Sequence, residues 1–93
     1  LAALMVGPFD LSVSMGHNGD WRHLDVQNAV TQIVEAATSK GLPVIMPVFA
    51  PSREECRALV KRWKSNGISC FVVGSDKILI AETLSEWSSV LTL

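Results

Sequence analysis

The sequence predicts an α/β fold made of three consecutive βα units with parallel strands. Three apolar runs, residues 2–6, 43–49 and 68–73, lack polar alternation, which is typical of strands buried on both faces. Each run is followed by a helical pattern. Strands that alternate with helices along the chain pair in parallel through crossover connections.

The first unit contains an acidic residue directly after its strand. The apolar run stops at Gly7-Pro8, Asp10 follows, and a loop that holds Gly16 and Gly19 comes next. We therefore expect Asp10 in a loop at the carboxyl end of the strand. A helix with an apolar face at positions 26, 29, 30, 33, 34 and 37 follows the loop, and Lys40-Gly41 predicts where it ends.

The second unit has a proline in its strand and a capping signal before its helix. Pro47 lacks an N–H donor, so we expect it at the C-terminal end of the strand, where the chain leaves the sheet. Ser52 and Glu55 match a capping box, in which each side chain satisfies a backbone donor of the other. Asn66-Gly67 predicts the end of this helix.

The third unit ends in a helix with widely spaced apolar residues. A turn at residues 74–76 follows the strand, and Ser75 or Asp76 is expected to cap the helix. Its apolar positions are Ile80, Leu84, Trp87 and Leu91.

The size of the units predicts a larger architecture. They average about 30 residues, so three of them would make about three eighths of a (β/α)8 TIM barrel. Parallel strands place the loops at residues 7–10, 46–49 and 74–76 on one side of the sheet. In such folds the functional residues lie on that side.

Composition excludes several classes of protein. The chain has 93 residues, 48% of them hydrophobic, and a net charge of -1, which indicates one globular domain. The basic residues are scattered and no apolar run reaches about 18 residues, so we expect a cytoplasmic protein that binds neither nucleic acid nor membrane. Because Leu1 begins inside an apolar stretch, we expect a fragment or a processed chain. Cys56 and Cys70 are expected as free core thiols.

Asp10 is the strongest candidate for chemistry. A carboxylate at a strand's carboxyl end can hold a divalent metal together with oxygen ligands from neighbouring strands, and the alternative is that it caps the loop. His17, Asp20 and His23 lie nearby, but their spacing in a glycine-containing loop does not aim three side chains at one point. We expect His23 to bond backbone at the helix start. Lys77 could form a Schiff base, a role that the neighbouring Asp76 disfavours.

The segment GPFDLSVSMG, residues 7–16, followed by His23 and the pair DV, resembles the HpcH/HpaI aldolase family of metal-dependent, pyruvate-using barrel enzymes. The resemblance implies that Asp10 is a ligand of a divalent metal, Mg²⁺ or Mn²⁺ with Co²⁺ or Zn²⁺ as alternatives. It also implies that the backbone N–H groups of Phe9 and Asp10 hold the oxo-acid carboxylate, and that Met46 lies near the methyl side of the substrate.

The likeness continues through HLDVQNAV and CFVVGSDKILIAETL, which implies that residues 1–93 are the last three βα units, the C-terminal part, of the barrel. Leu24 departs from the proline usual after the histidine, which affects the helix start. The family's second metal carboxylate, its carboxylate-binding Arg and its catalytic His come from earlier strands. This implies that the segment contains no catalytic residue of its own.

The function that the resemblance implies is that of an aldolase, a lyase that forms or cleaves the C–C bond between the enolate of pyruvate, or a related 2-oxo acid, and an aldehyde. The isolated segment is expected to be inactive, and the protein to be a homo-oligomer through its C-terminal helix. Two alternatives stay open. One is a non-catalytic scaffold or interaction remnant of the same fold, and the other is a truncated flavodoxin-like receiver in which Asp10 accepts a phosphoryl group.

Overall fold

The structure, a computed structural model, describes residues 2–92 and contains a three-stranded parallel sheet in the order β1–β2–β3. The strands are β1 (Leu4–Met5), β2 (Val44–Val48) and β3 (Cys70–Val73). Both neighbouring pairs are parallel, which confirms the three predicted βα units. Each strand is shorter than its apolar run. Flanking residues such as Val6 and Ile68 lie outside the paired segments and are nevertheless buried in the core.

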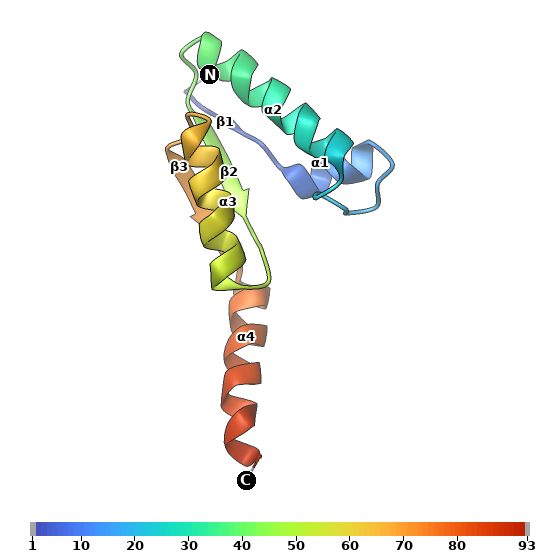
Figure 1. Cartoon of the computed structure of the whole chain (residues 1–93), viewed down its shortest axis with the longest axis vertical. Coiled ribbons are helices and arrows are strands. Elements are labelled where there is room, and N and C mark those ends of the chain that lie inside the picture. Colours follow the sequence, from blue (N-terminus) through green and yellow to red (C-terminus); the bar gives the residue numbers. More distant parts are fainter. Residues whose placement is uncertain (1, 93) are drawn as a thin grey trace.

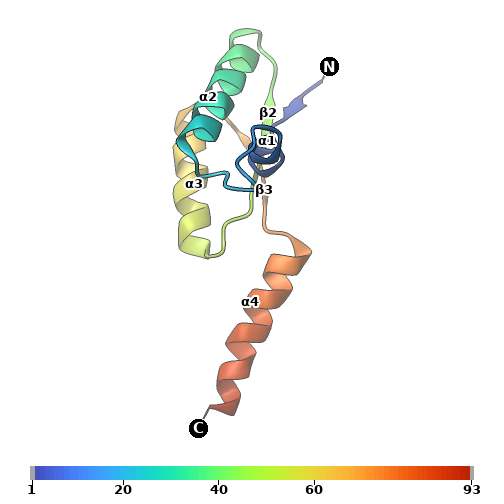
Figure 2. The same ribbon diagram turned by 90° about the vertical axis from the view of Figure 1, so that its right-hand side faces the viewer.

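Four helices connect and follow the strands. They are α1 (Pro8–Ser14), α2 (Leu24–Ser39), α3 (Arg53–Ser65) and α4 (Asp76–Ser88), and a 3-10 turn, η1 (Ser89–Leu91), continues α4. α4 extends away from the sheet and the other helices (Figure 1). α2 and α3 lie on the same side of the strands (Figure 2). Within residues 2–92, none of the helices has the length and apolar character needed to cross a membrane.

α1 corrects the sequence prediction, which placed residues 7–10 in a loop and expected no helix between them and the loop that holds Gly16 and Gly19. Pro8 occupies the first helical position, where its fixed φ favours a helix. The N–H of Leu11 donates to the carbonyl of Gly7 over 2.9 Å and closes the first turn. The fully buried Ser12 donates its hydroxyl hydrogen to the carbonyl of Phe9. The Gly-Pro pair therefore marks a helix start, and Asp10 lies in the first turn of α1.

Pro47 lies inside β2 rather than at its end, since the strand continues to Val48 and Pro47 is paired in register with Val72 of β3. Ile45 accepts a hydrogen bond from Val6 on the β1 side of the strand, whereas Val48 accepts one from Gly74 on the β3 side. Because backbone groups alternate between the two sides, the nitrogen of Pro47 faces β1. The pairing of β1 with β2 has already ended there, so the missing donor is tolerated.

Side-chain caps fix the start of the three longer helices. The N–H groups of Asp25, Glu55 and Ile78 donate to His23 Nδ1, Ser52 Oγ and Ser75 Oγ over 3.1, 3.1 and 3.4 Å. The predictions for these caps are confirmed, with Ser75 rather than Asp76 as the cap of α4.

The capping box before α3 is only half formed. Ser52 caps the helix, but the carboxylate of Glu55 forms an ion pair with Arg22 in the loop before α2. A charge-assisted hydrogen bond to a guanidinium is stronger than a bond to a neutral backbone N–H, which explains the exchange of partners.

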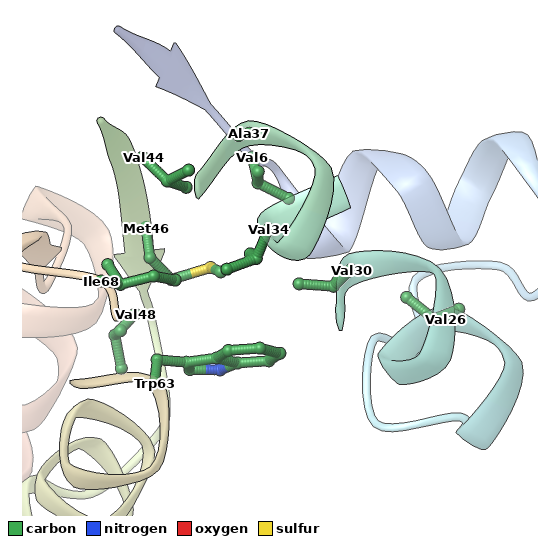
Figure 3. Close-up of a cluster of buried hydrophobic side chains, with 10 residues drawn as sticks. All are labelled: Val6, Val26, Val30, Val34, Ala37, Val44, Met46, Val48, Trp63 and Ile68. Carbon is green, nitrogen blue, oxygen red and sulfur yellow. The ribbon is translucent and has the colours of Figure 1, made fainter. Parts of the chain in front are cut away.

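The core lies between β2 and the two helices on its face. Every second residue of β2 is buried, namely Val44, Met46 and Val48, and these meet Val34 of α2 and Trp63 of α3. Figure 3 shows the side chain of Met46 extending from β2 toward Val34, with the ring of Trp63 beside it. The burial of Val26, Val30, Val34 and Ala37 confirms the predicted apolar face of α2.

The two cysteines do not share the core position expected of them. Cys56 of α3 is half-buried, and Cys70 of β3 is exposed, so the prediction of a core thiol is wrong for Cys70. Within the strand that carries Cys70, Phe71 packs against the core cluster, but no residue is buried.

Candidate functional site

A cavity of about 630 Å³ lies at the carboxyl ends of the strands. All three loops that the sequence placed on this side contribute to it, through Asp10 after β1, Phe49 after β2 and Ser75 after β3. Phe9 and Met46, the other two predicted site residues, also line it. The structure therefore brings all three predicted site residues together at one cavity.

The carboxylate of Asp10 has no partner. It forms neither a hydrogen bond nor an ion pair with any residue in the described range 2–92, so the loop-capping alternative finds no support there. The carboxylate lies against Gly7, where an added Cβ would be only 3.2 Å from Asp10 Oδ2. Asp10 is an exposed residue, so its carboxylate is available to an external ligand.

Two backbone donors accompany this carboxylate. Phe9 and Asp10 are the second and third residues of α1, and the N–H groups of a first helical turn have no partner within the helix. No other described residue accepts a hydrogen bond from either of them. Such amides at the positive end of a helix attract anions, so they can donate to a carboxylate.

The ring of Phe9 packs against the loop that follows α1. An added Cβ at Gly19 would be 2.8 Å from Phe9 Cε2, and Gly19 has a φ of +90°, so only glycine fits there. Phe9 is nevertheless 59% exposed and lines the cavity.

Met46 borders the cavity from the core. Its side chain is 1% exposed and packs in the core cluster with Val34 and Trp63. Its contact with a substrate, which the resemblance implies, stays a prediction.

Trp21, Gln27 and Lys77 also line the cavity, although none of them was predicted as a site residue. The sequence feature that could have identified Gln27 is a polar residue beside Val26 and Val30 on a helix face that is otherwise apolar. For Lys77 it is a position just after a strand end.

His17 and His23 come together, contrary to the expectation from their spacing. Their rings are stacked with centroids 3.7 Å apart and an interplanar angle of 21°. Asp25, rather than the nearby Asp20, joins them, with Oδ2 at 3.5 Å from His17 Nε2 and 3.8 Å from His23 Nδ1. The loop folds back on itself through positive φ angles at residues 16, 18 and 19.

This cluster offers a metal ion poor geometry. The lone pair of an imidazole lies in the plane of the ring, so two nearly parallel stacked rings do not direct their nitrogens at one point. His23 Nδ1 already accepts a hydrogen bond from the backbone N–H of Asp25. The cluster therefore serves the start of α2, as expected for His23.

Asp10 is the only carboxylate among the described residues that line the cavity. Divalent cations such as Mg²⁺ take six oxygen ligands, several of which are usually water or substrate oxygens. The exposed carboxylate and its adjacent amides fit one face of such a site, and the remaining ligands have to come from other groups.

Comparisons with known proteins found one matching family and several similar proteins. The sequence profile described as HpcH/HpaI aldolase/citrate lyase matches residues 1–76. A hydroxypyruvate/pyruvate aldolase of Paraburkholderia phytofirmans is 54% identical over 39 residues, 42% of this chain and 15% of that protein. A 5-keto-4-deoxy-D-glucarate aldolase of Shigella dysenteriae is 36% identical over 75 residues, 78% of this chain and 26% of that protein.

A solved structure is also similar. A HpcH/HpaI aldolase/citrate lyase family protein from Burkholderia cenocepacia superimposes on the whole chain with a TM-score of 0.81 and 26% sequence identity. The match covers 34% of that protein. This chain thus spans between about one seventh and one third of the relatives that it matches.

Proposed function

Because the chain belongs to the HpcH/HpaI aldolase/citrate lyase family, we propose that residues 1–93 form part of a metal-dependent aldolase built on a TIM barrel. The reaction joins the methyl carbon of pyruvate, or of a related 2-oxo acid, to the carbonyl carbon of an aldehyde, or runs in reverse. The methyl group loses a proton in the forward direction, and the aldehyde oxygen gains one.

The observation that carries this proposal is the unpartnered carboxylate of Asp10 beside two free amides at the cavity. Asp10 would hold a divalent cation, Mg²⁺ or Mn²⁺ with Co²⁺ or Zn²⁺ as alternatives, through its carboxylate. Such a cation, when bound, supplies Lewis-acid polarisation of the oxo-acid carbonyl.

The chain's own backbone and side chains would do the rest of the binding here. The amides of Phe9 and Asp10 would donate to the oxo-acid carboxylate and so orient the methyl group. Phe49, which lines the same cavity, would exclude water from it. Met46 would meet the methyl side of the substrate from the core.

Replacing Asp10 tests the proposal. In the full-length protein, Asp10→Ala should abolish metal-dependent exchange of the pyruvate methyl protons with D₂O, measured by proton NMR. Asp10→Asn, which keeps the shape but loses the charge, should also exchange at least about a hundredfold more slowly. Wild-type exchange rates in either variant would contradict the role of Asp10 as a metal ligand.

A second candidate is a non-catalytic scaffold of the same fold. It is favoured by the single carboxylate among the described residues of the cavity. In that case the wild-type full-length protein would bind neither Mn²⁺ nor pyruvate in calorimetry, and no exchange would be seen with any divalent metal.

A further inference from the structure

The loop between α1 and α2 holds Trp21 at the cavity through contacts with two helices. The carbonyl of Trp21 accepts a hydrogen bond of 2.5 Å from Gln27 Nε2 of α2. The guanidinium of Arg22 lies 4.4 Å from the centroid of the Trp21 ring and forms an ion pair with Glu55 of α3. Trp21 is thus fixed from the backbone and from one ring face, which is unusual for a residue in a surface loop.

The hydrogen bond from Gln27 to Trp21 comes with a cost to the stability of the fold. Its side chain is buried among apolar residues of α2, and its Oε1 has no hydrogen-bond partner within the described part of the chain. A buried acceptor without a partner is unfavourable, so an apolar side chain of similar size would suit the fold at least as well. A buried polar side chain that is left partly unpaired commonly belongs to a functional site. The one bond that Gln27 makes goes to Trp21.

The cavity is larger than an oxo acid needs. Its volume of about 630 Å³ is within the range of sites for drug-sized ligands, whereas pyruvate has three carbons. If pyruvate lies at Asp10 and the first turn of α1, the part of the cavity next to Trp21 is left for the second substrate. Trp21 and Phe49 give that space an apolar lining.

We propose that Trp21 determines specificity for the aldehyde by packing against its carbon chain, and that Gln27 is a positioning residue for Trp21. This inference rests on the proposed function. It assigns the second substrate to a class, an aldehyde with an apolar chain next to its carbonyl. Each methylene buried against the indole would favour the longer aldehyde.

The test compares acetaldehyde with butanal as partners of pyruvate in the full-length protein. We expect the wild type to have a kcat/KM for butanal about tenfold above that for acetaldehyde. Trp21→Ala should reduce this ratio to about one or two, and Trp21→Phe should lie between them. Pyruvate proton exchange should stay within twofold of wild type in both variants.

Gln27→Met separates positioning from folding. It should lower the butanal preference severalfold, while thermal unfolding occurs at the same temperature or higher because the unpartnered acceptor is gone. Asn28→Met, at the exposed neighbouring position, is the matched control and should change neither quantity.

The outcomes separate the two proposals. A wild type without chain-length preference, or a Trp21→Ala variant that keeps the wild-type ratio, overturns the specificity role even if pyruvate exchange is normal. A lower unfolding temperature in Gln27→Met, with an unchanged ratio, overturns the positioning role. Loss of pyruvate exchange in the wild type itself is instead the failure of the proposed aldolase function.

Discussion

Gly7 and Asp10 depend on each other at the scale of single residues. Gly7 has a φ of -105°, which any residue adopts, so its backbone does not require glycine. What a side chain would disturb is the carboxylate of Asp10, whose Oδ2 would be 3.2 Å from an added Cβ. The sequence presents this glycine as part of a turn signal, and only the structure shows that it leaves room for the candidate metal ligand.

Gly7→Ala should therefore weaken metal binding without unfolding the protein. We expect Mn²⁺ affinity, measured by calorimetry on the full-length protein, to fall about threefold to tenfold because the carboxylate has to move. Gly16→Ala is the contrasting variant, since Gly16 has a φ of +83° and nothing within 4 Å of the added carbon. It should lower the free energy of unfolding by about 1 kcal/mol and leave Mn²⁺ affinity unchanged.

Met46 is a residue whose two possible roles can be separated. Met46→Ala should lower the free energy of unfolding in urea by about 2–4 kcal/mol, because it leaves a cavity in the core cluster. Met46→Leu nearly conserves volume and should cost less than about 1.5 kcal/mol. A rise in the pyruvate KM of Met46→Leu would support the predicted substrate contact, and an unchanged KM would contradict it.

At the scale of elements, helix starts were predictable where a side chain caps the backbone. Ser52, Ser75 and His23 were identified because the cap is local and depends on residues two or three positions away. The exchange of partners at Glu55 was not predictable, since it depends on Arg22, which is 33 residues distant in the chain. α1 was missed because Gly-Pro is a signal both for a turn and for a helix start.

The cap of α3 gives a prediction about stability. Ser52→Ala should lower the free energy of unfolding by about 1 kcal/mol, because the N–H of Glu55 loses its acceptor. Ser65→Ala, at the other end of the same helix, removes an exposed hydroxyl that bonds the carbonyl of Arg62. That control should change stability by no more than about 0.5 kcal/mol, and equal effects of the two variants would contradict the capping role.

α4 carries apolar side chains without buried contacts. None of its residues is buried, and Trp87 is 70% exposed. We therefore predict that the full-length protein is a homo-oligomer through this helix. Leu84→Glu should shift the sedimentation coefficient toward that of the monomer, and Ser85→Glu, on a different side of α4, should not. A wild-type protein that sediments as a monomer at all concentrations would contradict this prediction.

At the scale of the whole molecule, the chain is elongated. Its radius of gyration is 15.5 Å, against about 12 Å for a compact domain of this length, because α4 projects from the rest. The order and direction of the strands followed from the alternation of apolar runs and helices. The site could be predicted only as a place, the carboxyl ends of the strands, because its lining comes from loops whose conformations depend on distant contacts.

The single carboxylate at the cavity predicts how residues 1–93 behave as an isolated chain. It should bind Mn²⁺ weakly, with a dissociation constant in the millimolar range, because Asp10 is the only carboxylate that the described residues bring to the cavity. It should show no aldol cleavage. Detectable turnover by the isolated chain, in a preparation checked by mass spectrometry, would contradict the dependence on further residues.

The position of Pro47 has a consequence for where Asp10 stands. In a parallel ladder that continued past the bond from Val6 to Ile45, the next donor would be the nitrogen of residue 47 and its acceptor the carbonyl of Val6. Proline lacks that donor, so β1 cannot pair further along β2, and the chain turns at Gly7 into α1. Pro47 in β2 thus ends the pairing of the neighbouring strand β1. The end of β1 in turn determines where α1 begins and where the Asp10 carboxylate lies relative to the sheet.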